Sequence, residues 1–351
     1  MAAQAPVPSS LPPPAPIAKR RLGASGPDVT VLGFGGAPLG DLYAPLDDAV
    51  AIATVEAALD AGIALVDTSP LYGRGLSEHR IGTALRRRPR SSLVLSTKVG
   101  RVFSPAPAGV RRAEGYAGGL PHEGRFDYSY DGAMRSLEQS MLRLGVASVD
   151  VALIHDVDPW THGESAGGRQ REALAGAYRA LADLRAQRVV RAIGIGVNDA
   201  DVCERFVREA DLDCVLLAGR YSLLEQPALD RFLPLATERR IGVMLGGVFN
   251  SGILATGAVA GARYNYRPAS PEVAQRVSAI ERVCAAHGVA LAHAALSFVL
   301  AHPAVSSVVL GAASPDDVRR NVAAFVRPVP EALWRDLKAE RLLRGDAPVP
   351  A

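Results

Sequence analysis

Cysteine is scarce in this chain of 351 residues, which holds three, all far apart in the sequence. An odd, dispersed set offers neither the paired spacing of a disulfide framework nor that of a zinc site, and it is typical of a reducing compartment. We therefore expect Cys203, Cys214 and Cys284 to be buried free thiols in a cytoplasmic protein.

An excess of one charge and long apolar runs are also missing. Lys and Arg number 39 against 36 Asp and Glu, a formal net charge of +3 that does not indicate nucleic-acid binding. No apolar run approaches the length of a membrane span. The Pro- and Ala-rich residues 1–18 lack the charged and apolar regions of a signal peptide, so we expect a disordered tail before a domain at 19–345.

The chain is rich in alternating patterns. From Thr30 onward, short runs of Val, Ile and Leu alternate with longer segments of helical periodicity. Predicted strands lie at residues 63–66, 92–98, 150–154, 191–195, 214–217, 241–245, 305–310 and 324–326. Predicted helices lie at residues 47–61, 77–87, 130–144, 172–187, 199–209, 227–239, 272–287, 291–301, 315–321 and 330–343.

Eight such units predict an α/β protein whose parallel strands close into a (β/α)8 TIM barrel. Residues 22–36 are expected to form an N-terminal β-hairpin at the bottom of the barrel. The long insertion at 103–127 favours a substrate loop. The main alternative is an open doubly wound sheet, but its Gly-x-Gly-x-x-Gly signature is missing after the first strand. The nearest match, residues 194–199, follows the fourth strand and lacks the third glycine.

Polar residues mark the ends of three predicted strands. Asp67 follows 63–66, Lys98 ends 92–98, and His155 follows 150–154, while Tyr72 comes five residues after Asp67. In a barrel the carboxyl ends of the strands meet at one face, where the active sites lie. We therefore expect these four side chains to share one mouth.

These four groups are the parts of a proton-transfer site. A Tyr hydroxyl titrates near pH 10, and a nearby ammonium makes it useful near neutrality by stabilising the phenolate. We assign that ammonium to Lys98, its orientation to Asp67, and a hydrogen bond to the substrate oxygen to His155. No metal is needed, and hydride chemistry belongs to a nicotinamide cofactor. Each residue alone also has a structural interpretation, so the prediction rests on all four together.

Over residues 20–345 the sequence resembles the aldo-keto reductases. The matching segments are 67–73 with Ser77 and Glu78, 96–98, 142–145 with Asp150, 153–155, 193–195 with Asn198, 252–254, and 311–312 with Asn321. The resemblance implies a catalytic tetrad of Asp67, Tyr72, Lys98 and His155, the same set that the chemistry selects.

Segments 35–40, 126–131, 155–158 and 247–252 are similar to the branch that holds the L-fucose (D-threo-aldose) 1-dehydrogenases, with the pyridoxal 4-dehydrogenases nearby. The resemblance implies oxidation of a cyclic aldose hemiacetal, of the L-fucose or D-arabinose type, to a lactone. Tyr72 would then accept the anomeric hydroxyl proton. A pyridoxal 4-dehydrogenase, a general NADPH-dependent aldehyde or ketone reductase, and a redox-sensing subunit remain as alternatives.

The resemblance also implies how the cofactor binds. The implied contacts are Asn198, Phe249, Asn250, Ser251, Gly252, Gly311, Asp317 and Asn321, although residues 247–252 also fit a plain Gly-rich turn. The family's aromatic after strand six and its Gln on strand five correspond here to Gly246 and Ala218. Asp316 and Asp317 precede any base in this region, and an acid would repel a 2′-phosphate, so NAD is preferred, with NADP possible.

The remaining expectations concern the substrate and partners. Tyr43 and Trp160 are candidates for lining a site for a sugar or a pyridoxal-like hemiacetal, and a shielding role is the alternative for Trp160. Residues 155–158 lack a Cys or His partner for a metal site. Tyr128 and Tyr130 are interpreted as packing before a helix capped by Ser129, with a role in binding substrate as the alternative. We expect a small-molecule enzyme, monomer or homodimer, without nucleic-acid or membrane partners.

Overall fold

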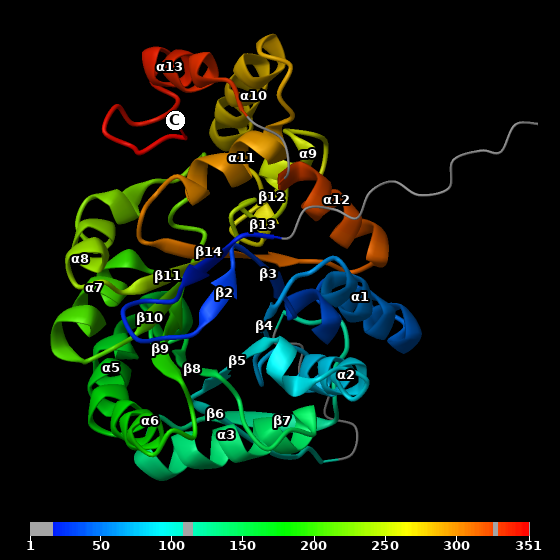
Figure 1. Ribbon diagram of the computed structural model, residues 1–351, viewed down its shortest axis with the longest axis vertical. Helices are drawn as coiled ribbons and strands as arrows, with labels where there is room; N and C mark the ends of the chain where they lie inside the picture. The colour runs from blue at the N-terminus through cyan, green and yellow to red at the C-terminus, as the bar shows by residue number, and fades with distance from the viewer. Residues whose placement is uncertain (1–16, 108–114, 326–328, 351) are drawn as a thin grey trace, which may run out of the picture.

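In the computed structural model, which describes residues 17–107, 115–325 and 329–350, parallel strands close into a barrel. The predicted tail lies almost wholly outside the described residues. Around the barrel, neighbours pair in the order β10-β11-β14-β3-β4-β5-β8-β9, seen as a ring in Figure 1. The strands are β3 (Leu32–Gly35), β4 (Leu65–Asp67), β5 (Val94–Val99), β8 (Val151–His155), β9 (Ala192–Val197), β10 (Cys214–Ala218), β11 (Gly242–Gly246) and β14 (Val305–Gly311). The predicted TIM barrel is confirmed.

Helices surround the barrel, with α1 and α2 on the opposite side from α7 and α8 (Figure 1). The helices are α1 (Asp48–Asp60), α2 (Leu76–Leu85), α3 (Tyr130–Leu144), α4 (Pro159–His162), α5 (Ala166–Ala175), α6 (Ala177–Ala186), α7 (Ala200–Glu209), α8 (Phe232–Glu238), α9 (Ile253–Thr256), α10 (Pro271–Ala286), α11 (Leu291–Leu300), α12 (Pro315–Phe325) and α13 (Glu331–Ala339). The helix predicted at 172–187 is two helices, α5 and α6, because the chain breaks at Gly176, where a side chain would lie 2.6 Å from the Tyr128 carbonyl oxygen.

Two predicted strand positions are wrong. The eighth strand was placed at 324–326, but Ala324 and Phe325 continue α12, and residue 326 lies outside the described part. The missing strand is β3, which lies within residues 22–36, the segment that the sequence assigns to the hairpin. It pairs with both β14 and β4 and closes the barrel. Its sequence, with glycine at every second position, lacks the β-branched residues that mark a strand. The actual hairpin is β1 (Lys19–Arg21) with β2 (Asp28–Thr30).

The hairpin closes one end of a packed barrel interior. Leu22 and Val29 belong to the same buried cluster as the inward side chains of the barrel strands. The strand members of this cluster are Leu65, Val94, Val151, Leu153, Ala192, Cys214, Leu216, Met244 and Val309. A second, larger cluster lies between the outer faces of the strands and the helices. With one end filled, the open end is the carboxyl end of the strands.

Long loops rise from that open end. The predicted insertion contains a hairpin of β6 (Arg101–Pro105) and β7 (His122–Phe126), whose tip at 108–114 is outside the described residues. A shorter hairpin, β12 (Arg263–Tyr264) with β13 (Arg267–Pro268), lies between β11 and α10 along the chain. Loops of this kind at the carboxyl end shape most barrel binding sites.

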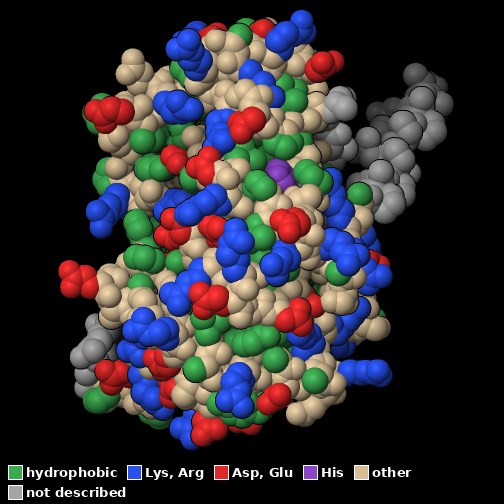
Figure 2. Space-filling model, turned by 90° about the vertical axis from the view of Figure 1, so that its left-hand side faces the viewer, with side chains coloured by type: hydrophobic (Ala, Val, Ile, Leu, Met, Phe, Trp, Pro, Cys, Tyr) green, Lys and Arg blue, Asp and Glu red, His purple; other side chains and the backbone are tan. Residues whose placement is uncertain are grey.

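The distribution of surface charge and the state of the cysteines agree with what the composition predicts. On the face shown in Figure 2, Lys and Arg side chains are interspersed with Asp and Glu. All three cysteines are buried and free, as predicted. Within the described residues no single helix has the length and apolar character of a membrane span; α10 and α11 satisfy that test only as a pair bent by 93°.

Candidate active site

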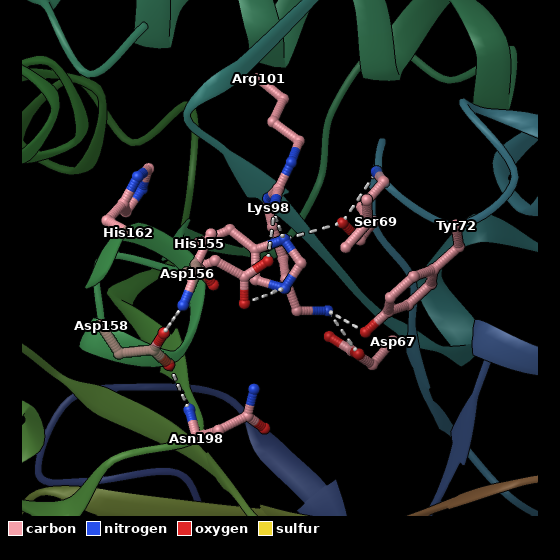
Figure 3. A network of polar contacts seen from close by, with 12 residues as sticks. Asp67, Ser69, Tyr72, Lys98, Arg101, His155, Asp156, Asp158, His162 and Asn198 are labelled. Carbon is pink, nitrogen blue, oxygen red and sulfur yellow. Dashed lines mark hydrogen bonds and ion pairs between the residues drawn. The ribbon is translucent and has the colours of Figure 1, made fainter. Parts of the chain in front are cut away.

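Strand periodicity directs three of the four predicted catalytic side chains into the barrel. Side chains alternate between the two faces of a strand. On β5, Val94 packs in the barrel interior, so Lys98, four residues later, points the same way. On β4 and β8, Asp67 and His155 each come two residues after an interior leucine, so their side chains also point into the barrel. Figure 3 shows Asp67, Lys98 and His155 close together, with the Tyr72 hydroxyl beside the Lys98 ammonium.

Lys98 and Asp67 form a buried ion pair. The Lys98 ammonium lies 2.7 Å from the Asp67 carboxylate and also donates to the Thr68 carbonyl at 2.8 Å. Ser96 donates to the second carboxylate oxygen at 2.8 Å. Both charged side chains are almost fully shielded from solvent. A desolvated pair of this kind is tolerable because further hydrogen bonds satisfy each partner.

Tyr72 is placed by a tight turn after β4. Gly73 adopts a left-handed φ of 62°, and a side chain there would lie 2.5 Å from the Gly40 carbonyl oxygen. The two loops therefore pack backbone against backbone, and the ring points inward. The Tyr72 hydroxyl oxygen lies 3.3 Å from the Lys98 ammonium, in the position that the sequence predicts.

The Tyr72 phenol is a weaker acid than we expect from the sequence, which predicts that the Lys98 ammonium lowers the pKa of this hydroxyl. Burial raises the pKa of Tyr72 well above its usual value, and the Asp67 and Asp156 carboxylates raise it further, while Arg101 opposes them. Because Lys98 is paired with Asp67 at short range, its charge is largely offset. The phenol is therefore protonated near neutral pH in the free protein, and a further positive charge beside it would favour the phenolate.

His155 is a neutral imidazole in a buried position. Burial lowers its pKa well below 6.5, and the neighbouring Arg101 and Lys98 cations lower it further. Its Nδ1 atom lies 3.0 Å from the Ser69 hydroxyl oxygen. The ring stands edge-on to Tyr72 with 6.2 Å between the centroids. His155 is thus suited to hydrogen bonding with an uncharged oxygen in the mouth.

Two site residues were missed from the sequence. The Arg101 guanidinium forms an ion pair with Asp156 at 2.8 Å, and both side chains are buried. Arg101 comes three residues after Lys98, where Gly100 with a φ of 111° turns the chain into β6. Asp156 directly follows His155, and the sequence assigns it no role in the site beyond its place in the resembling segment 155–158. Their positions beside predicted site residues were the available signal.

Residues 155–158, which the sequence disfavours as a metal site, hold the loop after β8 in place through hydrogen bonds. The Asp158 carboxylate accepts the Thr161 amide at 3.0 Å, which caps α4, and the Asn198 amide at 2.8 Å. Tyr128 is buried and donates to the His155 carbonyl at 2.9 Å, which matches its predicted packing role. These residues support the loop after β8.

Two adjoining cavities open over the tetrad. One encloses about 670 Å³ beside Tyr72, Lys98 and His155. The other encloses about 360 Å³ and runs from Tyr72 to Gly311 at the end of β14. They share the lining residues Ala37, Leu42, Tyr43, Tyr72, Trp160, Asn198, Leu216, Ala218 and Tyr266. We call them the substrate cavity and the cofactor cavity, after the roles argued below.

Aromatic side chains form the rim. The predicted residues Tyr43 and Trp160 line both cavities and are about half exposed. Tyr116 and Tyr266 also line the substrate cavity and were not predicted. They come from the insertion and from the turn between β12 and β13, whose approach to the barrel depends on loop conformation. Flat, half-exposed rings of this kind suit stacking against a small cyclic ligand.

Six of the eight predicted cofactor residues line the cofactor cavity. They are Asn198, Phe249, Asn250, Ser251, Gly252 and Gly311. The side-chain amide of Asn198 has no hydrogen-bond partner among the described residues and lies beside the tetrad (Figure 3). It can therefore bind a carboxamide. Gly246 and Ala218 lie opposite each other on β11 and β10 and leave the cavity open where a larger side chain would narrow it.

The segment from Asn250 to Gly252 fits an anionic group through its backbone. Asn250, Ser251 and Gly252 have φ values of 45°, 62° and 102°. The Asn250 side chain accepts from Ser222, and the Ser251 hydroxyl accepts from the Tyr266 amide, so both side chains build the loop. The Ser251 amide has no partner within the described part of the chain. The Asn250 and Gly252 amides donate to the Gly247 and Phe249 carbonyls within the loop, so the Ser251 amide is the donor left for an anion. Successive left-handed residues shape a concave backbone, and this single donor suits one oxygen of a pyrophosphate.

Asp317 and Asn321 do not line the cavity. The Asp317 carboxylate accepts the Ala313 amide at 3.0 Å and pairs with Arg320, so it shapes the start of α12. Asn321 donates to the Gly311 carbonyl at 3.3 Å, behind the cavity wall. Through these contacts both residues support the chain next to Gly311, which lines the end of the cavity.

Comparisons with known proteins agree with this geometry. The sequence profile of the Aldo/keto reductase family matches residues 31–340. Pyridoxal 4-dehydrogenase of Microbacterium luteolum is 42% identical, covering 93% of this chain and 98% of that protein. D-threo-aldose 1-dehydrogenase of a Pseudomonas species is 40% identical, covering 91% and 96%. The holo form of the aldo-keto reductase AKR11C1 from Bacillus halodurans superposes with a TM-score of 0.72 at 25% identity, covering 93% and 97%.

Proposed function

Because the chain belongs to the aldo/keto reductase family and is an oxidoreductase, we propose that it is an NAD-preferring dehydrogenase of cyclic hemiacetals. Its substrate would be an aldose of the L-fucose or D-arabinose type, oxidised at C1 to a lactone. The main support is the contact of 3.3 Å between the Tyr72 hydroxyl and the Lys98 ammonium, beside a neutral His155. All three groups line one cavity with aromatic walls.

The proposed reaction is balanced by one hydride and one proton. When bound, an oxidised nicotinamide would supply the acceptor for the hydride from C1 and would bring a positive charge to the site. This charge favours the Tyr72 phenolate, whose own proton is released to solvent. The phenolate oxygen then takes the proton of the anomeric hydroxyl as the C1–O bond becomes a carbonyl. Lys98 stabilises the phenolate, and Asp67 holds Lys98 in place. His155 donates a hydrogen bond to the same substrate oxygen and fixes its position.

The preference for NAD is supported by the charges at α12. Arg319 and Arg320 are each paired with an acid three residues earlier, Asp316 and Asp317. A guanidinium that already has a carboxylate partner is less available to a 2′-phosphate. The Asp317 carboxylate also accepts the Ala313 amide at the start of α12, so it acts here through Arg320 and the helix start.

Pyridoxal is the second candidate substrate. A relative of 42% identity carries the name pyridoxal 4-dehydrogenase, and pyridoxal also forms a cyclic hemiacetal. The half-exposed rings of Tyr43 and Trp160 suit stacking on a flat heterocycle as well as on a sugar.

A substrate panel tests the proposal. L-fucose, D-arabinose, L-galactose and pyridoxal are each incubated with NAD or NADP, and formation of reduced cofactor is followed. We expect one or more of these hemiacetals to be oxidised, with a higher kcat/KM for NAD. Faster NADPH-dependent reduction of small aldehydes, with no oxidation of any hemiacetal, would show instead a general aldehyde reductase.

A further inference from the structure

The imidazole of His155 is surrounded by partners on both of its nitrogen atoms. Nδ1 lies 3.0 Å from the Ser69 hydroxyl oxygen and 3.3 Å from a nitrogen of the Arg101 guanidinium. Nε2 lies 3.4 Å from a carboxylate oxygen of Asp156. Figure 3 shows Arg101 reaching down to both His155 and Asp156. The chemistry of these neighbours determines which nitrogen carries the hydrogen.

Both neighbours of Nδ1 can donate to it. A guanidinium has only N–H groups and no acceptor. The Ser69 hydroxyl can donate or accept; its oxygen accepts the Leu71 amide at 3.1 Å, and its own hydrogen can point to Nδ1 in the same way as the guanidinium hydrogen does. Nδ1 must therefore act as the acceptor. In a neutral ring the hydrogen then lies on Nε2, where the Asp156 carboxylate is an acceptor.

We propose that Arg101 and Asp156 are positioning residues that hold His155 as the neutral Nε2–H tautomer, with that hydrogen available to the substrate oxygen. The inference rests on the proposed role of His155 as a donor to that oxygen. It adds two residues to the machinery of the site, and each acts through His155. Arg101 and Asp156 position His155 together, because the Arg101 guanidinium contacts both the imidazole and the Asp156 carboxylate.

Arg101 is fixed as a rigid fork. One nitrogen faces Nδ1 of His155, and another forms the 2.8 Å ion pair with Asp156. The guanidinium carbon lies 4.5 Å from the centroid of the Phe126 ring, which restricts it to one plane. The Ser136 hydroxyl donates a hydrogen bond to the backbone carbonyl of Arg101 at 2.8 Å. A lysine, with a single point charge, cannot make the two contacts at once.

Asp156 is held in an uncommon backbone conformation. Its φ is 53°, in the left-handed region, which costs a non-glycine residue on the order of 1 kcal/mol. The conformation is fixed by its amide, which donates to the Gly196 carbonyl at 3.0 Å, and by Tyr128, which donates to its carbonyl at 3.1 Å. It brings the carboxylate next to the ring of the residue before it. Strain of this kind is concentrated at functional sites.

The hydrogen on Nε2 is weakly held and therefore available. The separation of 3.4 Å from Asp156 exceeds the usual range of about 2.7–3.2 Å for an N–H···O bond. The charged groups facing the ring are Arg101 from β6, Lys98 from β5 and Asp156, and Tyr72 approaches edge-on. Burial and the two cations keep the pKa of His155 low. A substrate oxygen that approaches Nε2 thus meets a neutral donor.

Nitrogen NMR of the histidine ring tests this inference directly in the substrate-free protein. The 15N shifts distinguish the two neutral tautomers and the charged form, and a His155→Gln variant assigns the signal. We expect His155 in the Nε2–H form and still neutral at pH 6.5. In Arg101→Met we expect the Nδ1–H form to appear and the titration to move upward. An Nδ1–H ring in the native protein, or an unchanged tautomer and titration in Arg101→Met, would overturn the proposal.

A charge-conserving pair of variants separates positioning from folding. Arg143 resembles Arg101 in having a buried carboxylate partner, Glu78 at 2.6 Å, and an aromatic ring, Phe103 at 5.7 Å, but it does not contact His155. We expect Arg101→Lys to lower kcat/KM by roughly tenfold and to shift its pH profile. Arg143→Lys should shift neither the profile nor the His155 signal. Equal shifts in both variants would show a general structural effect and overturn the proposal.

The two proposals fail separately. The NMR result needs no substrate, so a substrate panel without activity on hemiacetals leaves the tautomer assignment intact. In turn, a protein that oxidises aldoses while His155 carries its hydrogen on Nδ1 would retain the proposed function and lose only the role of Arg101 and Asp156.

Discussion

The Lys98 ammonium and the Asp67 carboxylate meet at 2.7 Å with both side chains almost wholly removed from solvent. The pair joins two neighbouring strands of the barrel, β4 and β5, and fixes a positive charge 3.3 Å from the Tyr72 hydroxyl. A buried pair contributes little net stability compared with apolar residues of the same size. Its position at the mouth of the barrel therefore indicates a functional role.

Removal of one partner of this pair should destabilise the protein strongly. Asp67→Asn or Lys98→Met leaves one buried charge uncompensated, which costs about 3–5 kcal/mol. The double variant should lose less than the sum of the two. Denaturant unfolding measures all three variants. Asp60→Asn, which removes the partner of Arg88 in an exposed pair at 2.6 Å, should cost less than about 1 kcal/mol. Additive losses in the double variant would contradict the account.

Replacement of Tyr72 by Phe should remove turnover and leave cofactor binding nearly intact. The variant lacks the oxygen that accepts the substrate proton, so kcat should fall by about 10²- to 10⁴-fold. Reduced-cofactor titration should give a Kd close to that of the native protein. Tyr130→Phe is the control, because the Tyr130 hydroxyl is on the surface and donates to Asp183 at 3.0 Å. Full activity in Tyr72→Phe would show that Tyr72 is not the residue that accepts the substrate proton.

Asp317→Asn should increase the use of NADP relative to NAD. The amide oxygen can still accept the Ala313 amide, but Arg320 loses its anionic partner and becomes available to a 2′-phosphate. An exposed pair is worth about 1 kcal/mol, so the ratio of kcat/KM values should shift by about fivefold. A second change, Arg320→Gln, should cancel the gain. An unchanged ratio would mean that α12 does not face the adenosine.

Acid should destabilise the protein partly through His302. Burial lowers the pKa of this side chain from 6.5 to about 4, and its Nδ1 accepts the Ala304 amide at 3.2 Å. The unfolded chain binds the proton more readily, so the contribution is fully present above pH 6.5 and is lost as pH falls toward 4. Thermal melts between pH 7 and pH 4 should show a smaller loss of Tm in His302→Gln. Parallel curves would rule out this contribution.

Much of the site could be predicted because it depends on periodicity. The apolar runs before Asp67, Lys98 and His155 determine both the strands and the inward direction of these side chains. The first strand, β3, was missed because its glycines carry no β-strand signal, and residues 324–326 were misassigned because a short apolar run also fits a helix.

The contacts of Arg101, Tyr116 and Tyr266 could not be predicted, for a different physical reason. Each lies on a hairpin or loop that folds back over the barrel, so its contacts depend on the turn geometry of the β6–β7 and β12–β13 segments. The low acidity of Tyr72 depends on burial, which the sequence of a loop does not show.

Transfer of deuterium from C1 tests the central claim most directly. An aldose that the protein oxidises, labelled with deuterium at C1, is converted with NAD, and both products are examined by mass spectrometry. The account predicts one deuterium in the reduced nicotinamide and an unlabelled lactone. Reduced cofactor without deuterium, or a sugar product oxidised at another carbon, would contradict it.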